Sequence, residues 1–186
     1  MNPAHKLSAC LWLTSLLIAC GGSTQPPSSC STPAGSHMFT GTVTAVHDGD
    51  TLTLGSGQGA QQVRLQGIDA PELAQPEGDT ARLALSAHVL HQGIHIAYTQ
   101  RDRYDRILGQ VIKADCTDVN LQLLNQGMAW FYRAYACDLE RPRRLLYAAA
   151  ESQARQKHLG LWGQSSPLAP WVFRNGDDPP APVCAD

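Results

Sequence analysis

The sequence has no excess of positive charge. Its 186 residues contain 14 lysines and arginines against 16 aspartates and glutamates, so the formal net charge is −2 at pH 7. Proteins that bind nucleic acids without sequence preference usually carry a basic field over a large surface. The balance argues against such a field. Any contact with a polyanion would have to come from a few well-placed arginines.

The sequence also has no apolar run long enough to span a bilayer comfortably. The run at residues 7–19 follows the positive Lys6 and is mostly apolar, but a spanning helix needs about 20 such residues. It ends in L-I-A-C (17–20), which resembles a bacterial lipobox. We therefore expect residues 1–20 to be a signal peptide and Cys20 to be the lipidated first residue of the mature chain. An ordinary secretory signal is the alternative, and both predict export.

The lipid on Cys20 would anchor the protein to the bacterial envelope, and we expect it to be the only contact with a membrane. The following residues 21–38 are rich in serine, proline and glycine, a composition that favours a linker without a core. We expect the folded domain at residues 39–175 and a tail at residues 176–186. With 43% hydrophobic residues, the chain suits a single domain with a real core.

The C-x-x-C spacing of common zinc sites is absent, which argues against a structural zinc ion. Of the six cysteines, two fall within the first twenty residues and four remain. An even number in an exported chain favours disulfides, and four cysteines allow three pairings. We favour Cys116–Cys137 within the domain and Cys30–Cys184 between the two tails. Free thiols are the alternative.

Hydrophobic periodicity predicts five strands and three helices. The strands are expected at residues 40–46, 51–54, 62–68, 94–99 and 107–112. The helices are expected at residues 79–92, 119–126 and 140–158. Strands with segregated helices indicate an α+β domain built on a small β-barrel, a type that binds ligands across a strand face.

The stretch His47–Glu72 gathers the most informative charges. Asp50, Asp69 and Glu72 share one strand–turn–strand unit with Arg64. The hairpin returns Asp69 to the end at which Asp50 begins, so both carboxylates can approach one ion. Carboxylates favour a hard cation, and a guanidinium matches the geometry of a phosphate. The stretch therefore indicates a metal and a phosphate, and a hairpin with solvated charges is the alternative.

The order of several motifs resembles the staphylococcal nuclease (thermonuclease-like) family from about residue 39 to residue 162. The motifs are D-G-D-T (48–51), V-R-L-Q-G-I-D-A-P-E (63–72), D-R-Y-D-R (102–106), V-N-L-Q-L-L-N-Q-G-M-A-W (119–130) and G-L-W (160–162). The closing P-L-A-P-W-V-F-R (167–174) is similar to the end of bacterial members. The resemblance implies an OB-fold barrel with about three helices. It also implies a Ca²⁺-dependent phosphodiesterase that cleaves DNA or RNA and leaves 3′-phosphorylated products.

The resemblance implies roles for single residues as well. The calcium ligands would be the carboxylates of Asp50 and Asp69 and the backbone carbonyl of Ala70. The catalytic residues would be Arg64, Glu72 and Arg106. The substrate contacts would come from Arg103, Tyr104 and Tyr135. The two catalytic arginines would bind phosphoryl oxygens, while the glutamate would take a proton from a water molecule or orient it.

The D-R-Y-D-R loop departs from the family pattern at one position. Asp105 stands where the family usually has glycine, directly before Arg106. Aspartate tolerates a left-handed backbone better than most residues, so Arg106 can still be placed, but the added negative charge is expected to weaken phosphate binding. In the D-G-D motif, Asp48 is interpreted as a turn former rather than a ligand.

Two other functions are compatible with the sequence. One is a catalytically silent nuclease-like module that binds nucleic acid or protein, although the chain keeps all five acids and arginines of the implied centre. The other is an envelope lipoprotein with a structural role. We expect the protein to be a monomer.

Overall fold

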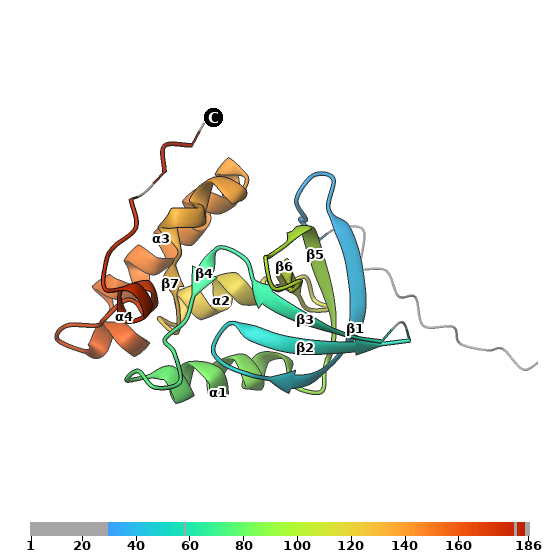
Figure 1. The fold of residues 1–186 in the computed structure, drawn as a ribbon, viewed down its shortest axis with the longest axis horizontal. Coiled ribbons are helices and arrows are strands. Elements are labelled where there is room, and N and C mark those ends of the chain that lie inside the picture. Colours follow the sequence, from blue (N-terminus) through green and yellow to red (C-terminus); the bar gives the residue numbers. More distant parts are fainter. Residues whose placement is uncertain (1–29, 58, 181, 185–186) are drawn as a thin grey trace, which may run out of the picture.

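The strands form where buried and solvent-facing side chains alternate. On β3 (Gly59–Leu65), Val63 and Leu65 are buried while Arg64 between them is partly exposed, as expected for a strand with one face in a core. The other barrel strands are β1 (His37–Val46), β2 (Thr51–Ser56), β5 (Gly93–Arg101) and β6 (Ile107–Ile112). They close in the order β1-β2-β3-β6-β5, and β1 pairs with both β2 and β5. The predicted five-stranded barrel of an α+β domain is confirmed (Figure 1).

The computed structural model describes residues 30–57, 59–180 and 182–184. The predicted signal peptide and Cys20 lie outside these ranges. The first strand begins at His37, three residues before the predicted start. No helix in the described ranges is both long enough and apolar enough to cross a membrane.

Helices cover one end of the barrel and one of its sides (Figure 1). The α-helices are α1 (Gly78–Val89), α2 (Val119–Asn125), α3 (Arg141–Gln156) and α4 (Pro170–Asn175). Two 3₁₀ helices, η1 (Arg133–Asp138) and η2 (Gly160–Gly163), flank α3. The first three α-helices lie within two residues of their predicted starts. The short α4, which begins with a proline at its first turn, was not predicted.

One apolar core runs from the barrel interior into the helices. Leu52 and Val63 in the barrel belong to the same buried cluster as Leu85 of α1, Leu123 of α2 and Tyr147 of α3. On α3, buried residues recur at helical spacing, which fixes the face that packs on the domain. The barrel and helices therefore form one rigid support for the loops between strands.

The predicted third strand breaks at Gly67. Gly67 has a φ of 78°, and a Cβ there would lie 2.7 Å from a methyl carbon of Leu139, so both the backbone conformation and the packing require glycine. The chain then forms β4 (Ile68–Asp69), which pairs with β7 (Trp130–Phe131) in a separate two-stranded sheet. Asp69 thereby leaves the barrel and lies opposite Trp130.

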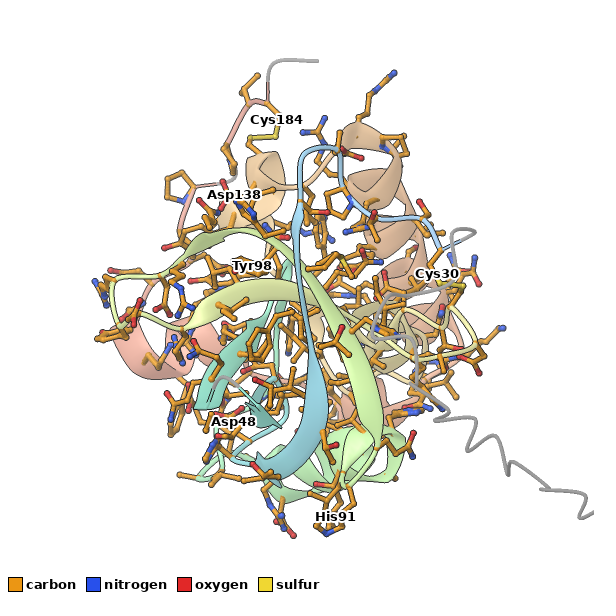
Figure 2. The ribbon with its side chains drawn as sticks, turned by 90° about the vertical axis from the view of Figure 1, so that its right-hand side faces the viewer. Cys30, Asp48, His91, Tyr98, Asp138 and Cys184 are labelled. Atoms are coloured by element: carbon orange, nitrogen blue, oxygen red, sulfur yellow. A yellow bond between two sulfur atoms is a disulfide. The ribbon has the colours of Figure 1, made fainter. Side chains whose placement is uncertain are left out.

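The predicted disulfide pairing is wrong. The structure pairs Cys30 with Cys116 and Cys137 with Cys184, each with Cα atoms 5.1 Å apart. Cys116 lies in the turn between β6 and α2, whereas Cys137 lies in η1. Cys30 and Cys184 also lie on separate parts of the surface (Figure 2). A disulfide needs Cα atoms within about 7 Å of one another, so the two tail cysteines cannot pair with each other. Each tail is instead bonded to a different part of the domain.

Removing the Cys30–Cys116 disulfide is expected to lower the melting temperature by roughly 5 to 15 °C. The bond closes a long loop with a sequence separation of 86, and such bonds typically contribute about 2 to 4 kcal/mol, each worth about 2 to 4 °C in a domain of this size. The measurement is calorimetry on the variant Cys30→Ser/Cys116→Ser. Peptide mapping of the unreduced wild type is the control. Recovery of a Cys116–Cys137 peptide would contradict the pairing.

Candidate active site

The turn between β1 and β2 places Asp50. The amide of Asp50 donates to Asp48 Oδ1 at 3.0 Å, which is the side-chain turn expected of Asp48. Between them, Gly49 packs so tightly that a Cβ would lie 2.5 Å from the Cβ of Ala70 and 2.8 Å from that of Ala81. The turn is thus pressed against the chain that follows β4. Asp50 Oδ2 accepts a hydrogen bond from the amide of Ala70 at 2.6 Å.

Arg64 joins the two predicted calcium carboxylates. Its Nη1 lies 2.6 Å from Asp50 Oδ2, and its Nη2 lies 2.6 Å from Asp69 Oδ1. The Arg64 side chain is only 14% exposed, and the two aspartate side chains are 7% and 1% exposed. A planar guanidinium can hold two carboxylates in one fixed arrangement. The structure therefore brings together the three hairpin residues that the sequence predicted.

Glu72 lies beside this group and is partly exposed. Its loop is held by Gln75, whose Oε1 accepts from the amide of Glu72 at 2.9 Å. Gly78, at the start of α1, is close enough that a Cβ there would lie 2.0 Å from the carbonyl oxygen of Glu72. The start of α1 therefore sets the position of the loop that carries Glu72.

The sequence analysis assigned no role to Arg174, which the structure places at the site. Arg174 Nη2 lies 2.7 Å from Asp69 Oδ2, and Nη1 lies 2.6 Å from Glu72 Oε1. It comes from α4, more than a hundred residues along the chain from both acids. Its only sign in the sequence was the resemblance of residues 167–174 to the end of bacterial members.

Burial raises the pKa of Asp50 well above its usual value, although Arg64 acts in the opposite direction. Burial also raises the pKa of Asp69, against the lowering effects of Arg64 and Arg174. The two arginines thus do not fully compensate the buried negative charge of Asp50 and Asp69. A bound cation would relieve this cost, because an opposite charge nearby favours the ionised carboxylate.

The oxygen donors of this site fit a hard divalent cation such as Ca²⁺. No group of three or more His, Cys, Asp or Glu side chains arranged to hold a metal occurs in the part of the chain that the structure describes. The family resemblance predicts Asp50 and Asp69 as the side-chain ligands, and the two carboxylates lie on either side of Arg64. Ca²⁺ accepts six to eight oxygen ligands and takes backbone carbonyls and water readily. The carbonyl of Ala70 and water molecules can complete such a set.

Arg106 directly precedes β6, the strand that pairs with β3 beside Arg64. β3 and β6 are parallel, with Val63 opposite Ile107 and Arg64 opposite Leu108. Extended by one residue, this register puts Arg106 on the same face as Arg64, with the two Cα atoms roughly 8 Å apart. Arg106 is not bonded to the hairpin carboxylates; its Nε donates to Asp102 Oδ2 at 2.7 Å.

The loop before β6 is organised by Asp102. Its Oδ1 accepts from the amides of Tyr104 and Arg106. Burial alone would raise the pKa of Asp102, but the hydrogen bonds from Arg106 and the loop amides outweigh it and lower the pKa. Asp105 has a φ of 63° and its amide donates to the Asp102 carbonyl. The left-handed conformation expected at Asp105 is confirmed.

The predicted substrate residues fall in two places. Arg103 and Tyr104 lie in the same loop as Arg106, and the guanidinium carbons of Arg103 and Arg106 lie 4.8 and 5.4 Å from the Tyr104 ring centre. Tyr135 lies in η1, exposed, with its ring 4.9 Å from that of Tyr132. The structure thus groups Arg103 and Tyr104 with Arg106, and leaves Tyr135 on a different segment.

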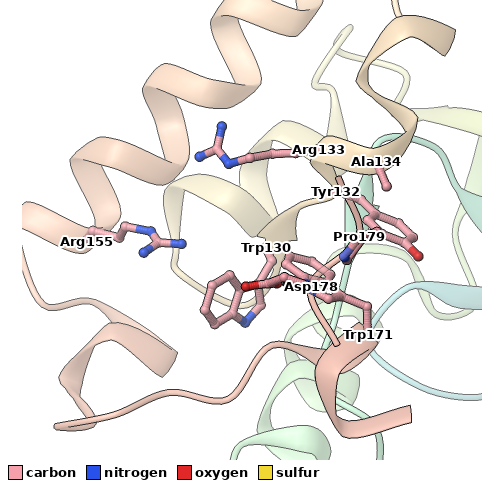
Figure 3. A pocket seen from close by; sticks show the side chains of 8 residues that line it. All are labelled: Trp130, Tyr132, Arg133, Ala134, Arg155, Trp171, Asp178 and Pro179. Atoms are coloured by element: carbon pink, nitrogen blue, oxygen red, sulfur yellow. Dashed lines mark hydrogen bonds between the residues drawn. The ribbon is translucent and has the colours of Figure 1, made fainter. Parts of the chain in front are cut away.

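A cavity of about 400 Å³ adjoins β7, the strand that pairs with Asp69. Figure 3 shows its walls, formed by Trp130, Tyr132, Arg133, Ala134, Arg155, Trp171, Asp178 and Pro179. The guanidinium groups of Arg133 and Arg155 point into the same space as the Trp130 ring. Tyr132 lines this cavity, whereas Tyr135 does not. Aromatic rings with nearby cations suit a planar, negatively charged ligand.

Comparison with known proteins assigns the chain to a family. A model of the staphylococcal nuclease homologue family matches residues 62–164. A protein named as an uncharacterized endonuclease in Escherichia coli is 37% identical over 135 residues, covering 73% of this chain and 84% of that protein. Another of that name in Haemophilus influenzae is 37% identical over 133 residues, covering 71% of each chain. A micrococcal nuclease of Shigella flexneri is 34% identical over 144 residues, covering 73% of this chain and 80% of that protein.

The matched segment contains Arg64, Asp69, Glu72 and Arg106, while Asp50 and Arg174 lie on either side of it. The barrel brings Asp50 back to Arg64 and Asp69 through the hairpin that the D-G-D motif predicts. On the family match, the extent of similarity to these relatives and the five-stranded barrel, the chain belongs to the staphylococcal nuclease family.

Proposed function

We propose that this protein is a calcium-dependent nuclease that hydrolyses phosphodiester bonds of DNA, RNA or both and leaves 3′-phosphorylated products. The observation that carries the proposal is Arg64 held between the buried carboxylates of Asp50 and Asp69. Arg106, directly before the adjacent strand β6, would supply a second cation. Family membership supports hydrolytic nuclease activity, and the similarity to proteins named as nucleases points the same way.

In the proposed reaction, each residue has a separate task. Bound calcium would neutralise the charge that builds up on the phosphoryl oxygens. Arg64 and Arg106 would donate in forks to phosphoryl oxygens from two sides. Glu72 Oε2, the oxygen that is not bonded to Arg174, would accept a proton from the attacking water or orient it.

The surfaces around the site suit a nucleic-acid strand. Arg103 and Tyr104 lie beside Arg106 and would contact a neighbouring phosphate or sugar. The cavity lined by Trp130 and Tyr132 offers aromatic surface for a base, and each stacked base is typically worth about 1 to 3 kcal/mol. The family resemblance predicts a substrate contact at Tyr135. Its neighbour Tyr132, which lines the cavity, would share that contact. Backbone contacts read little sequence, so we expect broad substrate use.

We also propose that the protein works outside the cytoplasm as a monomer, lipid-anchored through Cys20 to the bacterial envelope. The two disulfides support this placement, because such bonds persist mainly in oxidising compartments. Calcium is a suitable cofactor there, since extracellular calcium sites operate at high micromolar to millimolar concentrations.

The proposal is tested by incubating the purified mature protein with single- and double-stranded DNA and with RNA. We expect cleavage in calcium, none in a calcium chelator, and recovery when calcium is added back. End-group analysis of the fragments should find 3′-phosphates. Each such cut also leaves a free 5′ hydroxyl on the neighbouring fragment, which a kinase can label. Binding without cleavage in all conditions would instead support the silent-module alternative.

Replacing Asp105 with glycine is expected to lower KM for a DNA oligonucleotide by about twofold at low salt. A like charge roughly 10 Å from the bound phosphate costs about 0.4 kcal/mol in water, and glycine adopts the positive φ of this position without strain. The effect should fade at high salt as the charge is screened. Asp79→Asn, which removes an exposed acid on α1, is the matched control. A higher KM would contradict the expectation.

A further inference from the structure

The Glu72 side chain has one partner among the described residues, and that partner is Arg174. Arg174 Nη1 donates to Glu72 Oε1 at 2.6 Å and to Asp69 Oδ1 at 3.3 Å, while Nη2 donates to Asp69 Oδ2 at 2.7 Å. The Glu72 side chain is 36% exposed. A glutamate this exposed has several accessible rotamers, and holding it in one of them requires a directed partner. The fork of Arg174 ties it to the buried Asp69.

Arg174 is itself held by the packing of α4. Three residues before it, the Trp171 ring lies parallel to the Tyr132 ring with centres 5.2 Å apart, and meets Trp130 edge-on at 5.4 Å. Trp171 Nε1 donates to Asp178 beyond the helix. Trp130 is the strand partner of Asp69. The same group of stacked rings, Trp130, Tyr132 and Trp171, therefore helps to position both Arg174 and Asp69.

A second contact links this C-terminal segment to the Glu72 loop. The buried Gln75 accepts from the amide of Glu72 and donates through Nε2 to the carbonyl of Leu168 at 3.0 Å. The Glu72 backbone is thus tied to residue 168 and its side chain to residue 174. Beyond them, the Cys137–Cys184 disulfide closes the tail onto η1. Leu168 is thus bonded to the Glu72 loop, and Cys184 is bonded to η1.

We propose that Arg174 is a positioning residue of this nuclease that acts through Glu72 and Asp69. It sets the orientation of the Glu72 carboxylate, so that Oε2 faces the reacting water, and it holds one oxygen edge of Asp69. The proposal rests on the proposed function. It gives the C-terminal segment, which lies beyond the part matched by the family model, a role in the chemistry.

The contacts of Arg174 suit a positioning role. Both terminal nitrogens are engaged by carboxylates at 2.6 and 2.7 Å. Arg64 is engaged by two carboxylates in the same way, so the effects of Arg174→Ala on kcat and KM decide between positioning and direct binding.

The test is a double-mutant cycle on cleavage of a labelled DNA oligonucleotide. Arg174→Ala should lower kcat about 10- to 100-fold, the usual effect of removing an outer partner of a site, with KM changed by less than about twofold, since uniform binding is not lost. In the Glu72→Gln background, the same change should lower kcat by clearly less than it does in the wild type, with the remaining loss coming from the contact with Asp69. Arg82→Ala, which removes an exposed arginine paired with Asp79 on α1, is the matched control and should match the wild type.

Two further measurements separate positioning from support of the fold. Millimolar guanidinium should restore part of the kcat of Arg174→Ala, whereas it should not help Arg64→Ala to the same degree, because Arg64 also binds the phosphate. In the calcium-free protein, chemical denaturation should show that Arg174→Ala and Glu72→Gln are non-additive. Additive effects in both the kinetic and the unfolding cycles would overturn the proposal.

The outcomes distinguish this inference from the proposed function. If the wild type shows no calcium-dependent cleavage, both the proposed function and the inference are wrong. If the wild type cleaves DNA in calcium and Arg174→Ala has the same kcat, the inference alone is wrong. A raised KM with unchanged kcat would also overturn it, by making Arg174 a substrate contact.

Discussion

Replacing Arg64 with alanine is expected to lower kcat for DNA cleavage by about 100- to 1,000-fold, the usual cost of losing one positioned donor to a transition-state oxygen. The structure adds a second reason. Arg64 is the cation between Asp50 and Asp69, at 2.6 Å from each. Without it, two buried carboxylates lose their shared partner, so the geometry proposed to hold calcium is lost along with the proposed donor to the phosphate.

The comparison with Arg64→Lys makes this prediction sharper. Lysine keeps the positive charge but cannot bridge two carboxylates in a fixed plane, so we expect it to recover little of the activity. Activity is measured as kcat and KM at saturating calcium, below the melting temperature of every variant. Arg82→Ala serves as the charge-matched control on α1. Cleavage by Arg64→Ala at the wild-type rate would show that the chemistry takes place elsewhere.

Replacing Asp50 with asparagine is expected to abolish calcium-dependent cleavage and, at neutral pH without calcium, to raise the melting temperature. Burial raises the folded-state pKa of Asp50 well above its usual value, despite the opposing effect of Arg64. Between the unfolded and folded pKa values, the folded state holds the proton more tightly. In that window the free energy of unfolding falls as pH rises, and the ionised carboxylate destabilises the metal-free fold at neutral pH.

This prediction is checked by calorimetry of the calcium-free wild type and Asp50→Asn from about pH 4, near the ordinary carboxyl pKa, upwards to neutrality. The wild type should gain stability as the pH falls through this window, and the variant should gain less. Each kcal/mol gained corresponds to about 2 to 4 °C in a domain of this size. Asp79→Asn is the control for loss of an exposed charge. A variant that melts below the wild type at neutral pH would contradict the expectation.

The barrel and the hairpin acids were within reach of sequence reasoning because their signals are local. Val63 and Leu65 alternate with Arg64, the Asp48-Gly49 turn returns the chain, and the strand at residues 107–112 has the predicted bounds. Period-two alternation states which side chains share a face. Alternation alone would put Asp69, five residues after Arg64, on the opposite face, and the turn at Gly67 is what brings it to Arg64.

The other features depend on contacts that no local pattern encodes. Arg174 is separated from Glu72 by 102 positions, and its placement follows from the stacking of Trp171 on Tyr132. The disulfide partners are set by which tail passes the β6–α2 turn and which passes η1. The break at Gly67 was hidden because the chain is extended on both sides of it, in β3 of the barrel before it and in β4 of the small sheet after it.

Calcium dependence of cleavage tests the central claim most directly. Wild-type protein and Arg64→Ala are assayed side by side on one labelled DNA oligonucleotide, with calcium titrated from chelator to millimolar at constant ionic strength. We predict saturable cleavage by the wild type that follows calcium occupancy and vanishes in chelator, and almost none by the variant. Cleavage that is equal with and without calcium, or equal for the two proteins, would contradict the assignment of Asp50, Arg64 and Asp69 as the catalytic centre.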